Sequence, residues 1–199
     1  MVSEVSSSEL KGLDAGSWFN RKYPQLAQAT YYRETVPTLK QLFDVLADTR
    51  ALLYLEMKSE DRESDALAAR VVRLINRYSL RERAVVESFA LASLRTIKRI
   101  DARIRTAALF EPRRRPVSLL RKMRMVSLAR GCGAEEIALH HALVSRRLVE
   151  KARQYNLQTV VWTVDNAAWI KRARSLNIKA LITNHPAEMI NLRDTSRAD

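Results

Sequence analysis

The stretch Ala51-Leu52-Leu53-Tyr54-Leu55-Glu56-Met57-Lys58 decides the fold class of this chain. Its short apolar run, followed by polar residues, predicts a buried strand of a parallel sheet. Because side chains alternate along a strand, Tyr54, Glu56 and Lys58 are expected on one face. Burying an unpaired carboxylate or amine is costly, and ligands bind at the carboxyl ends of parallel strands. Glu56 and Lys58 are therefore candidate site residues, with an internal ion pair between them as the alternative.

A unit of one helix and one apolar strand recurs through the rest of the chain. Further strands are predicted at residues 84–89, 105–110, 136–140, 159–164 and 180–183, with amphipathic helices between them. Thr38, Ser145 and Asn166 are predicted helix N-caps, and Gln41 completes a capping box with Thr38. Pro186 is expected to open a terminal helix.

Strict alternation of strands and helices predicts an α/β fold with a parallel sheet, either a barrel or a doubly wound sheet. The sequence has four glycines, and no Gly-rich phosphate motif follows a strand, which argues against a dinucleotide or P-loop site. The barrel is favoured, although an eight-stranded barrel typically needs about 250 residues. We therefore expect a TIM-barrel-like (β/α) fold that is incomplete, with about six parallel strands.

The length of 199 residues predicts a single domain, 1–199. Within it, residues 1–34 are expected to form an irregular N-terminal segment and residues 35–199 the truncated barrel. No apolar run approaches the roughly 18 residues of a membrane span, and the first residues do not resemble a signal peptide. These features predict a cytoplasmic protein without a transmembrane segment. The lone Cys132 lies between two glycines and is expected to be a loop residue.

The net charge of +13 is unevenly distributed, because residues 1–65 carry −3 and residues 66–199 carry +16. Such a basic surface attracts phosphate in nucleic acids, anionic lipid heads or small substrates. Nucleic acid is not expected, because no recognised motif or aromatic platform is present. Arg113–Arg115 is either a patch for anionic groups or a solvated loop. In the basic segment that follows it, apolar side chains are expected to face the core: Leu119, Leu120, Met123 and Val126.

Six short motifs, taken in order, resemble those of the glycerophosphodiester phosphodiesterases. They are Gly16-Ser17-Trp18-Phe19, Val36-Pro37-Thr38-Leu39, Leu55-Glu56-Met57-Lys58, Glu87-Ser88-Phe89, Val161-Trp162-Thr163-Val164 and Ile182-Thr183-Asn184-His185-Pro186. The resemblance implies a TIM barrel that hydrolyses a glycerophosphodiester to an alcohol and glycerol 3-phosphate, an activity of lipid metabolism. It also implies a divalent metal, usually Ca²⁺ or Mg²⁺.

The resemblance implies roles for four residues. Glu56 falls at the position of a metal-ligating carboxylate, and Lys58 at that of a catalytic amine that neutralises the substrate. Phe89 and Trp162 fall where the family lines the pocket for glycerol and phosphate. Elementary chemistry agrees, because carboxylate oxygens suit a hard cation and an amine offsets charge on a phosphoryl group.

The sequence also departs from the family pattern. Family members begin with a strand ending in His-Arg-Gly and a strand carrying Glu-x-Asp, whereas no His occurs here before His140. The chain is therefore expected to correspond to the last six barrel strands and to have little or no activity alone. The alternative function is a non-catalytic module that binds phosphate or anionic lipid. Exposed edges of an open barrel also predict self-association.

Three histidines and one further carboxylate remain to be placed. Adjacent strand residues point to opposite faces, so at most one of His140 and His141 is expected to face the barrel interior. His140 is predicted to be a satisfied strand-end residue, and His185 a loop residue beyond the last strand. Glu87 lies at a strand end, but its face is ambiguous from the sequence.

Overall fold

A computed structural model describes residues 4–58, 64–112 and 118–195. Contacts within the chain divide it into two compact units, Met1–Ala51 and Leu52–Asp199. The division falls after the helix that follows Thr38, whereas the sequence placed the start of the barrel at residue 35. Arg113–Arg115, a candidate anion-binding patch, lies outside the described residues.

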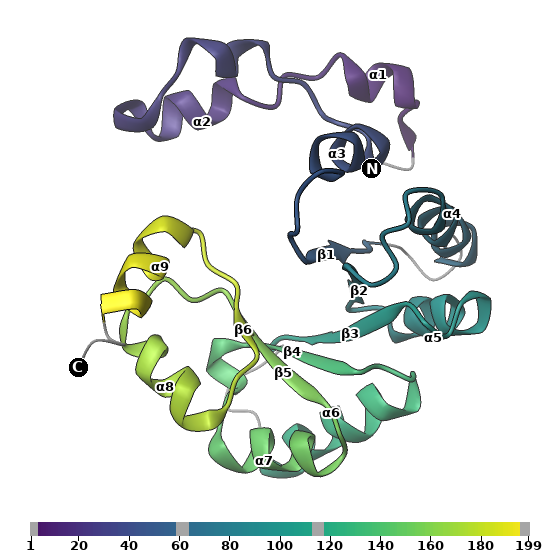
Figure 1. Ribbon diagram of the computed structural model, residues 1–199, viewed down its shortest axis with the longest axis vertical. Coiled ribbons are helices and arrows are strands. Elements are labelled where there is room, and N and C mark those ends of the chain that lie inside the picture. The colour runs from purple at the N-terminus through teal and green to yellow at the C-terminus, as the bar shows by residue number, and fades with distance from the viewer. Residues whose placement is uncertain (1–3, 59–63, 113–117, 196–199) are drawn as a thin grey trace. The chain divides into compact units, whose positions relative to one another are not determined.

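The second unit contains a parallel sheet of six strands in the order β1-β2-β3-β4-β5-β6. The strands are β1 (Leu53–Glu56), β2 (Ala84–Ser88), β3 (Arg105–Phe110), β4 (Glu136–His140), β5 (Gln158–Trp162) and β6 (Ala180–Leu181). The sheet curls into a half-barrel with helices along its outer side (Figure 1). This architecture confirms the predicted α/β fold with an incomplete TIM-barrel arrangement.

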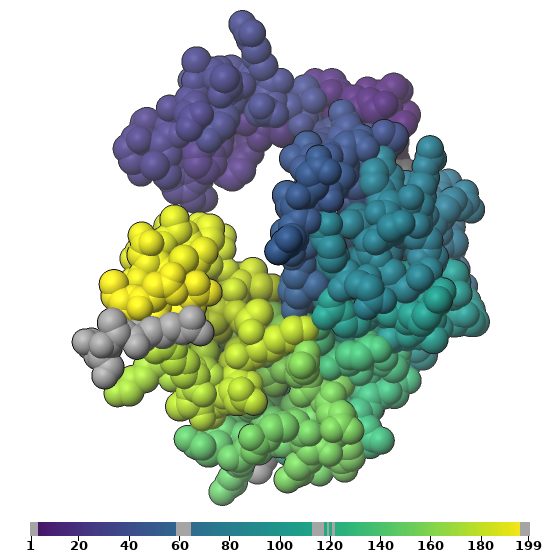
Figure 2. Space-filling view, in the orientation of Figure 1, coloured from purple at the N-terminus to yellow at the C-terminus, as the bar shows by residue number. Residues whose placement is uncertain are grey.

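Helices connect these strands, as the alternating pattern predicts. They are α4 (Ser64–Arg77), α5 (Leu91–Ile100), α6 (Leu119–Gly131), η4 (His141–Leu143), α7 (Arg146–Gln154), α8 (Ala168–Leu176) and α9 (Pro186–Thr195). The predicted cap at Ser145 is confirmed, since its hydroxyl accepts the Leu148 N–H at 3.3 Å. Helices α4 and α5 pack together and form one continuous teal surface (Figure 2).

Two apolar clusters lie on the opposite faces of the sheet. The outer cluster, between the sheet and the helices, includes Ile137 and Leu139 of β4 with Val126 of α6. The inner cluster includes Ala138 of β4 and Val160 of β5 and defines the inner face of the sheet. Because both faces are buried, the strands read as nearly continuous apolar runs rather than as alternating ones.

Helix α6 differs from its predicted packing. Met123 and Val126 contact the outer cluster as expected, but Leu120 is 82% exposed. The expectation that Leu120 faces the core is therefore wrong. The helix begins at Leu119, so Leu120 lies in its first turn, where it does not reach the cluster that Met123 and Val126 join. The side chain of Leu119 lies outside the described part of the structure.

The first unit contains more regular structure than the sequence predicts. It holds α1 (Ser7–Lys11), α2 (Ser17–Lys22), η2 (Pro24–Leu26), η3 (Ala29–Arg33) and α3 (Leu39–Leu46). The predicted capping box of α3 is confirmed, because Thr38 and Gln41 exchange backbone-to-side-chain hydrogen bonds of 2.9 and 3.2 Å. A Cβ at Gly16 would lie 1.8 Å from the Tyr31 carbonyl oxygen, so only glycine fits at the start of α2.

Within the described residues, no helix is long and apolar enough to cross a membrane.

Candidate active site

Glu56 and Lys58 lie together where β1 ends. The Lys58 Nζ is 3.7 Å from a Glu56 carboxylate oxygen, and the side chains are 81% and 33% exposed. An ion pair this exposed contributes at most about 1 kcal/mol to stability. The strand ends at Glu56, but Met57 beyond it is buried while Lys58 is exposed, so the alternation continues and Glu56 and Lys58 lie on the same side of the chain. Lys58 is a solvent-facing amine beside a half-exposed carboxylate.

Glu87 is the neighbour of Glu56 across the β1–β2 ladder, with which it is in register. Parallel partners in register point to the same face, and Val85, two residues earlier, belongs to the inner cluster. Glu87 is therefore an inner-face residue, and it is 7% exposed. Burial, followed by the negative charges of Glu56 and Glu136, raises the pKa of Glu87 to about 7.

One oxygen of Glu87, Oε2, is buried and has no hydrogen-bond partner among the described residues. Among the described residues, the indole Nε1 of Trp162 is the other buried side-chain polar atom without a hydrogen-bond partner. An unsatisfied buried polar atom costs roughly 1–3 kcal/mol. Both atoms lie on the inner face near the carboxyl ends of β2 and β5, so this part of the molecule offers one acceptor and one donor to a ligand.

Ser88 ties the ends of β1 and β2 together. Its buried hydroxyl donates to the Met57 carbonyl oxygen at 2.7 Å and accepts the Ala90 N–H at 3.1 Å. The Met57 N–H in turn donates to the Glu87 carbonyl oxygen at 2.8 Å. These bonds fix the two short segments that carry Lys58 on one side and Phe89 on the other.

Phe89 and Trp162 meet at this end of the sheet. Their rings lie edge to face, with centroids 5.6 Å apart, although Phe89 follows β2 and Trp162 ends β5, two strands that β3 and β4 separate. Trp162 also packs edge to face against His140, its partner in register. The structure therefore brings the two predicted substrate-binding aromatics together on the inner face.

A second buried carboxylate, Glu136, is completely buried on the inner face at the start of β4. It accepts hydrogen bonds from the Tyr54 hydroxyl at 2.8 Å and from the Lys179 amine at 2.5 Å. Burial and the bond to Glu136 raise the pKa of the Tyr54 hydroxyl. Glu136 was not singled out from the sequence, although it stands two residues before inner-face Ala138. That spacing is the signal that identifies it.

The histidines have local partners. His140 Nδ1 accepts the Ala142 N–H at 3.2 Å, which agrees with the prediction of a satisfied strand-end residue. His141 Nδ1 lies 2.9 Å from the Thr163 carbonyl oxygen, and its ring packs near Trp169. Exposed His185 follows β6 in a loop, as predicted.

Cys132 is buried, and its thiol donates to the Ala129 carbonyl oxygen just beyond α6. Burial raises the pKa of the Cys132 thiol, which makes it an inert residue.

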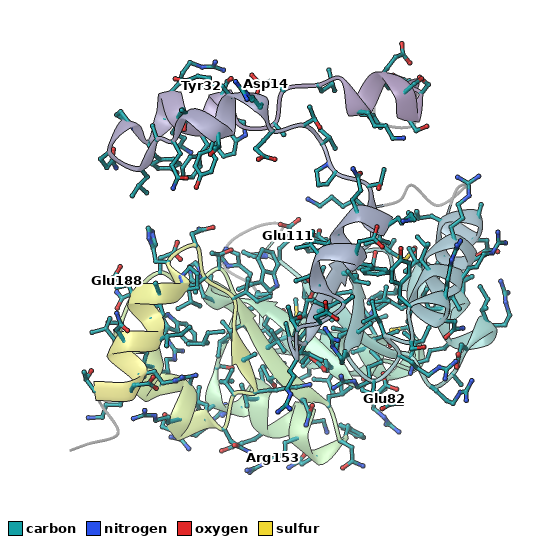
Figure 3. The ribbon with its side chains drawn as sticks, turned by 45° about the horizontal axis from the view of Figure 1, so that its top comes forward. Asp14, Tyr32, Glu82, Glu111, Arg153 and Glu188 are labelled. Carbon is teal, nitrogen blue, oxygen red and sulfur yellow. The ribbon has the colours of Figure 1, made fainter. Side chains whose placement is uncertain are left out.

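A hollow of about 370 Å³ adjoins Phe89, between the ends of β2 and β3 and helix α6. Met125 and Leu128 supply part of its apolar wall, while Glu111 and Arg124 are its charged residues. Glu82 precedes β2 and Glu111 follows β3, so the two labelled residues mark the amino and carboxyl ends of these neighbouring strands (Figure 3).

The residues at the strand ends fit a divalent cation in part. No group of three or more His, Cys, Asp or Glu side chains that could hold a metal ion is found within residues 4–58, 64–112 and 118–195. Two neighbouring carboxylates, Glu56 and Glu87, nevertheless offer the oxygen chemistry that Ca²⁺ and Mg²⁺ prefer. The unpartnered oxygen of Glu87 is consistent with such a ligand.

The fold and site define a TIM-barrel-type α/β protein with carboxylates and aromatics at the carboxyl ends of its strands. The model of the Glycerophosphoryl diester phosphodiesterase family matches residues 1–188, and the chain belongs to this family.

Two relatives share this family's activity by name. A glycerophosphodiester phosphodiesterase of Caldanaerobacter subterraneus subsp. tengcongensis is 25% identical over 193 residues, which cover 96% of this chain and 72% of that protein. One of Bacillus subtilis is 27% identical over 191 residues, covering 93% of this chain and 63% of the relative. This chain therefore spans roughly two thirds of each relative's length.

Solved structures show the same fold. A phosphodiesterase of Oleispira antarctica, in complex with the product sn-glycerol-3-phosphate, superposes with a TM-score of 0.80 at 17% identity, covering 98% of this chain and 72% of that one. A glycerophosphodiester phosphodiesterase of Parabacteroides distasonis gives a TM-score of 0.71 at 20% identity, covering 89% and 72%.

Proposed function

We propose that the strand-end site binds the glycerol phosphate part of a glycerophosphodiester and takes part in hydrolysing it to an alcohol and glycerol 3-phosphate. One observation carries the proposal. The two buried side-chain polar atoms without partners in the described residues, Glu87 Oε2 and Trp162 Nε1, both lie on the inner face near the strand ends. A buried donor without a partner suits a phosphate oxygen, and buried acceptors suit a cation or a hydroxyl.

The residues have complementary roles in this proposal. Lys58, which is 81% exposed, is free to turn its amine toward a phosphoryl group and offset its negative charge. Phe89 and Trp162, whose rings pack edge to face and which we call the aromatic corner, supply an apolar wall for the glycerol backbone. Glu56 would hold a divalent cation, Ca²⁺ or Mg²⁺, which when bound would neutralise charge on the phosphoryl oxygens.

Three further features belong to the proposal. The outer strands β1 and β6 have one neighbour each in the sheet, and we propose that these edges allow self-association. We also propose a part in lipid metabolism, which follows from the proposed substrate, and a cytoplasmic location. Light scattering over a range of protein concentrations tests the proposed self-association, and a constant monomer mass would contradict it.

Ligand binding tests the proposed function. Titration of sn-glycerol 3-phosphate in the presence of Ca²⁺ is expected to change the tryptophan fluorescence of the 199-residue chain. Trp162→Phe should weaken binding about tenfold, because its indole donor is lost, whereas Trp18→Phe should not. Equal affinity for inorganic phosphate and for sn-glycerol 3-phosphate would instead indicate a general phosphate-binding module.

An activity assay is the second test of the proposed function. With glycerophosphocholine as substrate, the chain alone is expected to release glycerol 3-phosphate at a rate close to background, since it contains no His before His140. Cation-dependent release well above background, lost in Glu56→Ala, would contradict that expectation while supporting the site.

A further inference from the structure

Two buried glutamates on the inner face have different surroundings, and only one is neutralised by the protein. Glu136 is fully buried and is compensated by the Lys179 amine and the Tyr54 hydroxyl. Glu87 is also buried, at 7% exposure, yet it takes part in no salt bridge of the described residues. Burying an ionised carboxylate without a counter-charge is unfavourable, so Glu87 is the one of these two glutamates whose negative charge a bound cation would compensate.

The geometry restricts what that partner is. Glu87 is the in-register neighbour of Glu56, so the two carboxylates project from adjacent strands onto the same face. The amine of Lys58 pairs with Glu56 from the solvent side, which leaves the buried side toward Glu87 without a cation. A small hard ion with oxygen ligands fits between two such carboxylates better than an organic cation does.

The segments that carry these carboxylates are fixed. Glu87 lies within β2, and the Ser88 hydroxyl fastens the Met57 carbonyl beside it at 2.7 Å. The Met57 N–H donates to the Glu87 carbonyl at 2.8 Å. Rigid strand ends of this kind hold the two carboxylates in position before a cation binds, which lowers the entropic cost of cation binding.

We propose that Glu87 is a second protein ligand of a divalent-cation site that it shares with Glu56. The inference rests on the proposed function and extends it to a residue whose role the sequence left open. The unpartnered, buried Oε2 of Glu87 is the independent observation that points to a ligand. The remaining coordination positions are left to water, to substrate oxygens and to other protein groups.

Calorimetric titration with CaCl2, and separately MgCl2, tests the inference on metal-free protein. Glu56→Gln and Glu87→Gln keep the side-chain shape but remove a charge, and each should weaken cation binding at least about tenfold, because affinity follows the number of charged ligands. Glu82→Gln, an exposed carboxamide substitution before β2, is the matched control and should change the Kd less than about twofold.

Several outcomes decide the inference. Wild-type affinity in Glu87→Gln, together with a loss in Glu56→Gln, would overturn it while leaving the proposed function intact. So would sn-glycerol 3-phosphate binding that needs Trp162 but no cation. If circular dichroism shows that Glu87→Gln does not fold, Glu87→Asp replaces it. The shorter carboxylate should weaken binding about threefold or more, and unchanged affinity would contradict the inference.

Discussion

Glu56 and Glu87 stand opposite each other in the ladder between β1 and β2, one half-exposed and ion-paired, the other buried without a cation. This pair links the fold to the proposed chemistry. Adjacent parallel strands in register place both carboxylates on the inner face. Glu56 lies on the outer strand β1, whereas Glu87 lies on β2, which has a neighbouring strand on each side, and is buried.

Glu87→Gln is expected to change how stability depends on pH. The pKa of Glu87 is raised to about 7 in the folded chain, from 4.5, so the folded state holds this proton more tightly. Its contribution to stability is therefore full below about pH 4.5 and is lost as the pH rises to about 7, by roughly 1–3 kcal/mol. Glu87→Gln removes that loss, so the variant should gain stability relative to wild type between pH 5 and 8.

Urea unfolding at several pH values, in buffer containing EDTA, measures this difference. Glu82→Gln serves as the exposed control and should follow the wild-type curve. A stability difference between Glu87→Gln and wild type that stays constant from pH 5 to 8 would show that Glu87 does not titrate in this range.

Ser88→Ala should destabilise the chain by about 1–2 kcal/mol. The substitution leaves the buried Met57 carbonyl without the 2.7 Å bond from the Ser88 hydroxyl. Ser175→Ala is a matched control, because the Ser175 hydroxyl also donates to a backbone carbonyl but is exposed, and it should cost less than about 0.5 kcal/mol. Equal effects in urea unfolding would mean that Ser88 does not fasten the strand ends.

Lys179→Met should be strongly destabilising, by about 3–5 kcal/mol, because it strands the fully buried Glu136 charge. The double variant Glu136→Gln with Lys179→Met removes both charges and should recover part of this loss. Lys171→Met, at an exposed position of α8, should have little effect. Additive losses in the double variant would rule out a direct coupling between Glu136 and Lys179.

Phe89→Ala should weaken sn-glycerol 3-phosphate binding about five- to tenfold without unfolding the chain. Phe89 is 44% exposed and contributes one wall of the aromatic corner with Trp162, so its loss affects the site more than the core. Phe110→Ala supplies a comparison at the end of β3, packed against the outer cluster. A larger binding defect in Phe110→Ala than in Phe89→Ala would place the glycerol elsewhere.

Much of the fold follows from local pattern. The strands at Arg105–Phe110 and Glu136–His140 have the predicted bounds, because buried parallel strands leave apolar runs bounded by polar residues. The cap at Ser145 and the box of Thr38 with Gln41 are also local, since each is a contact over three residues.

The site was harder to predict because its contacts are distant in sequence. Tyr54 reaches Glu136 across 82 residues, and Lys179 reaches Glu136 across 43. No spacing within a short stretch of sequence predicts that Tyr54 and Lys179 contact Glu136. Likewise, the pairing of Glu56 with Glu87 across the β1–β2 ladder joins residues 31 positions apart, which no pattern within either strand predicts.

Calorimetry of sn-glycerol 3-phosphate binding to wild type and Glu56→Ala, with Ca²⁺ or with EDTA, tests the central claim most directly. We predict binding by the wild-type chain in Ca²⁺, at least about tenfold weaker binding in EDTA, and a similar loss in Glu56→Ala. Wild-type affinity in Glu56→Ala with Ca²⁺ present would contradict a cation-assisted phosphate site at the end of β1.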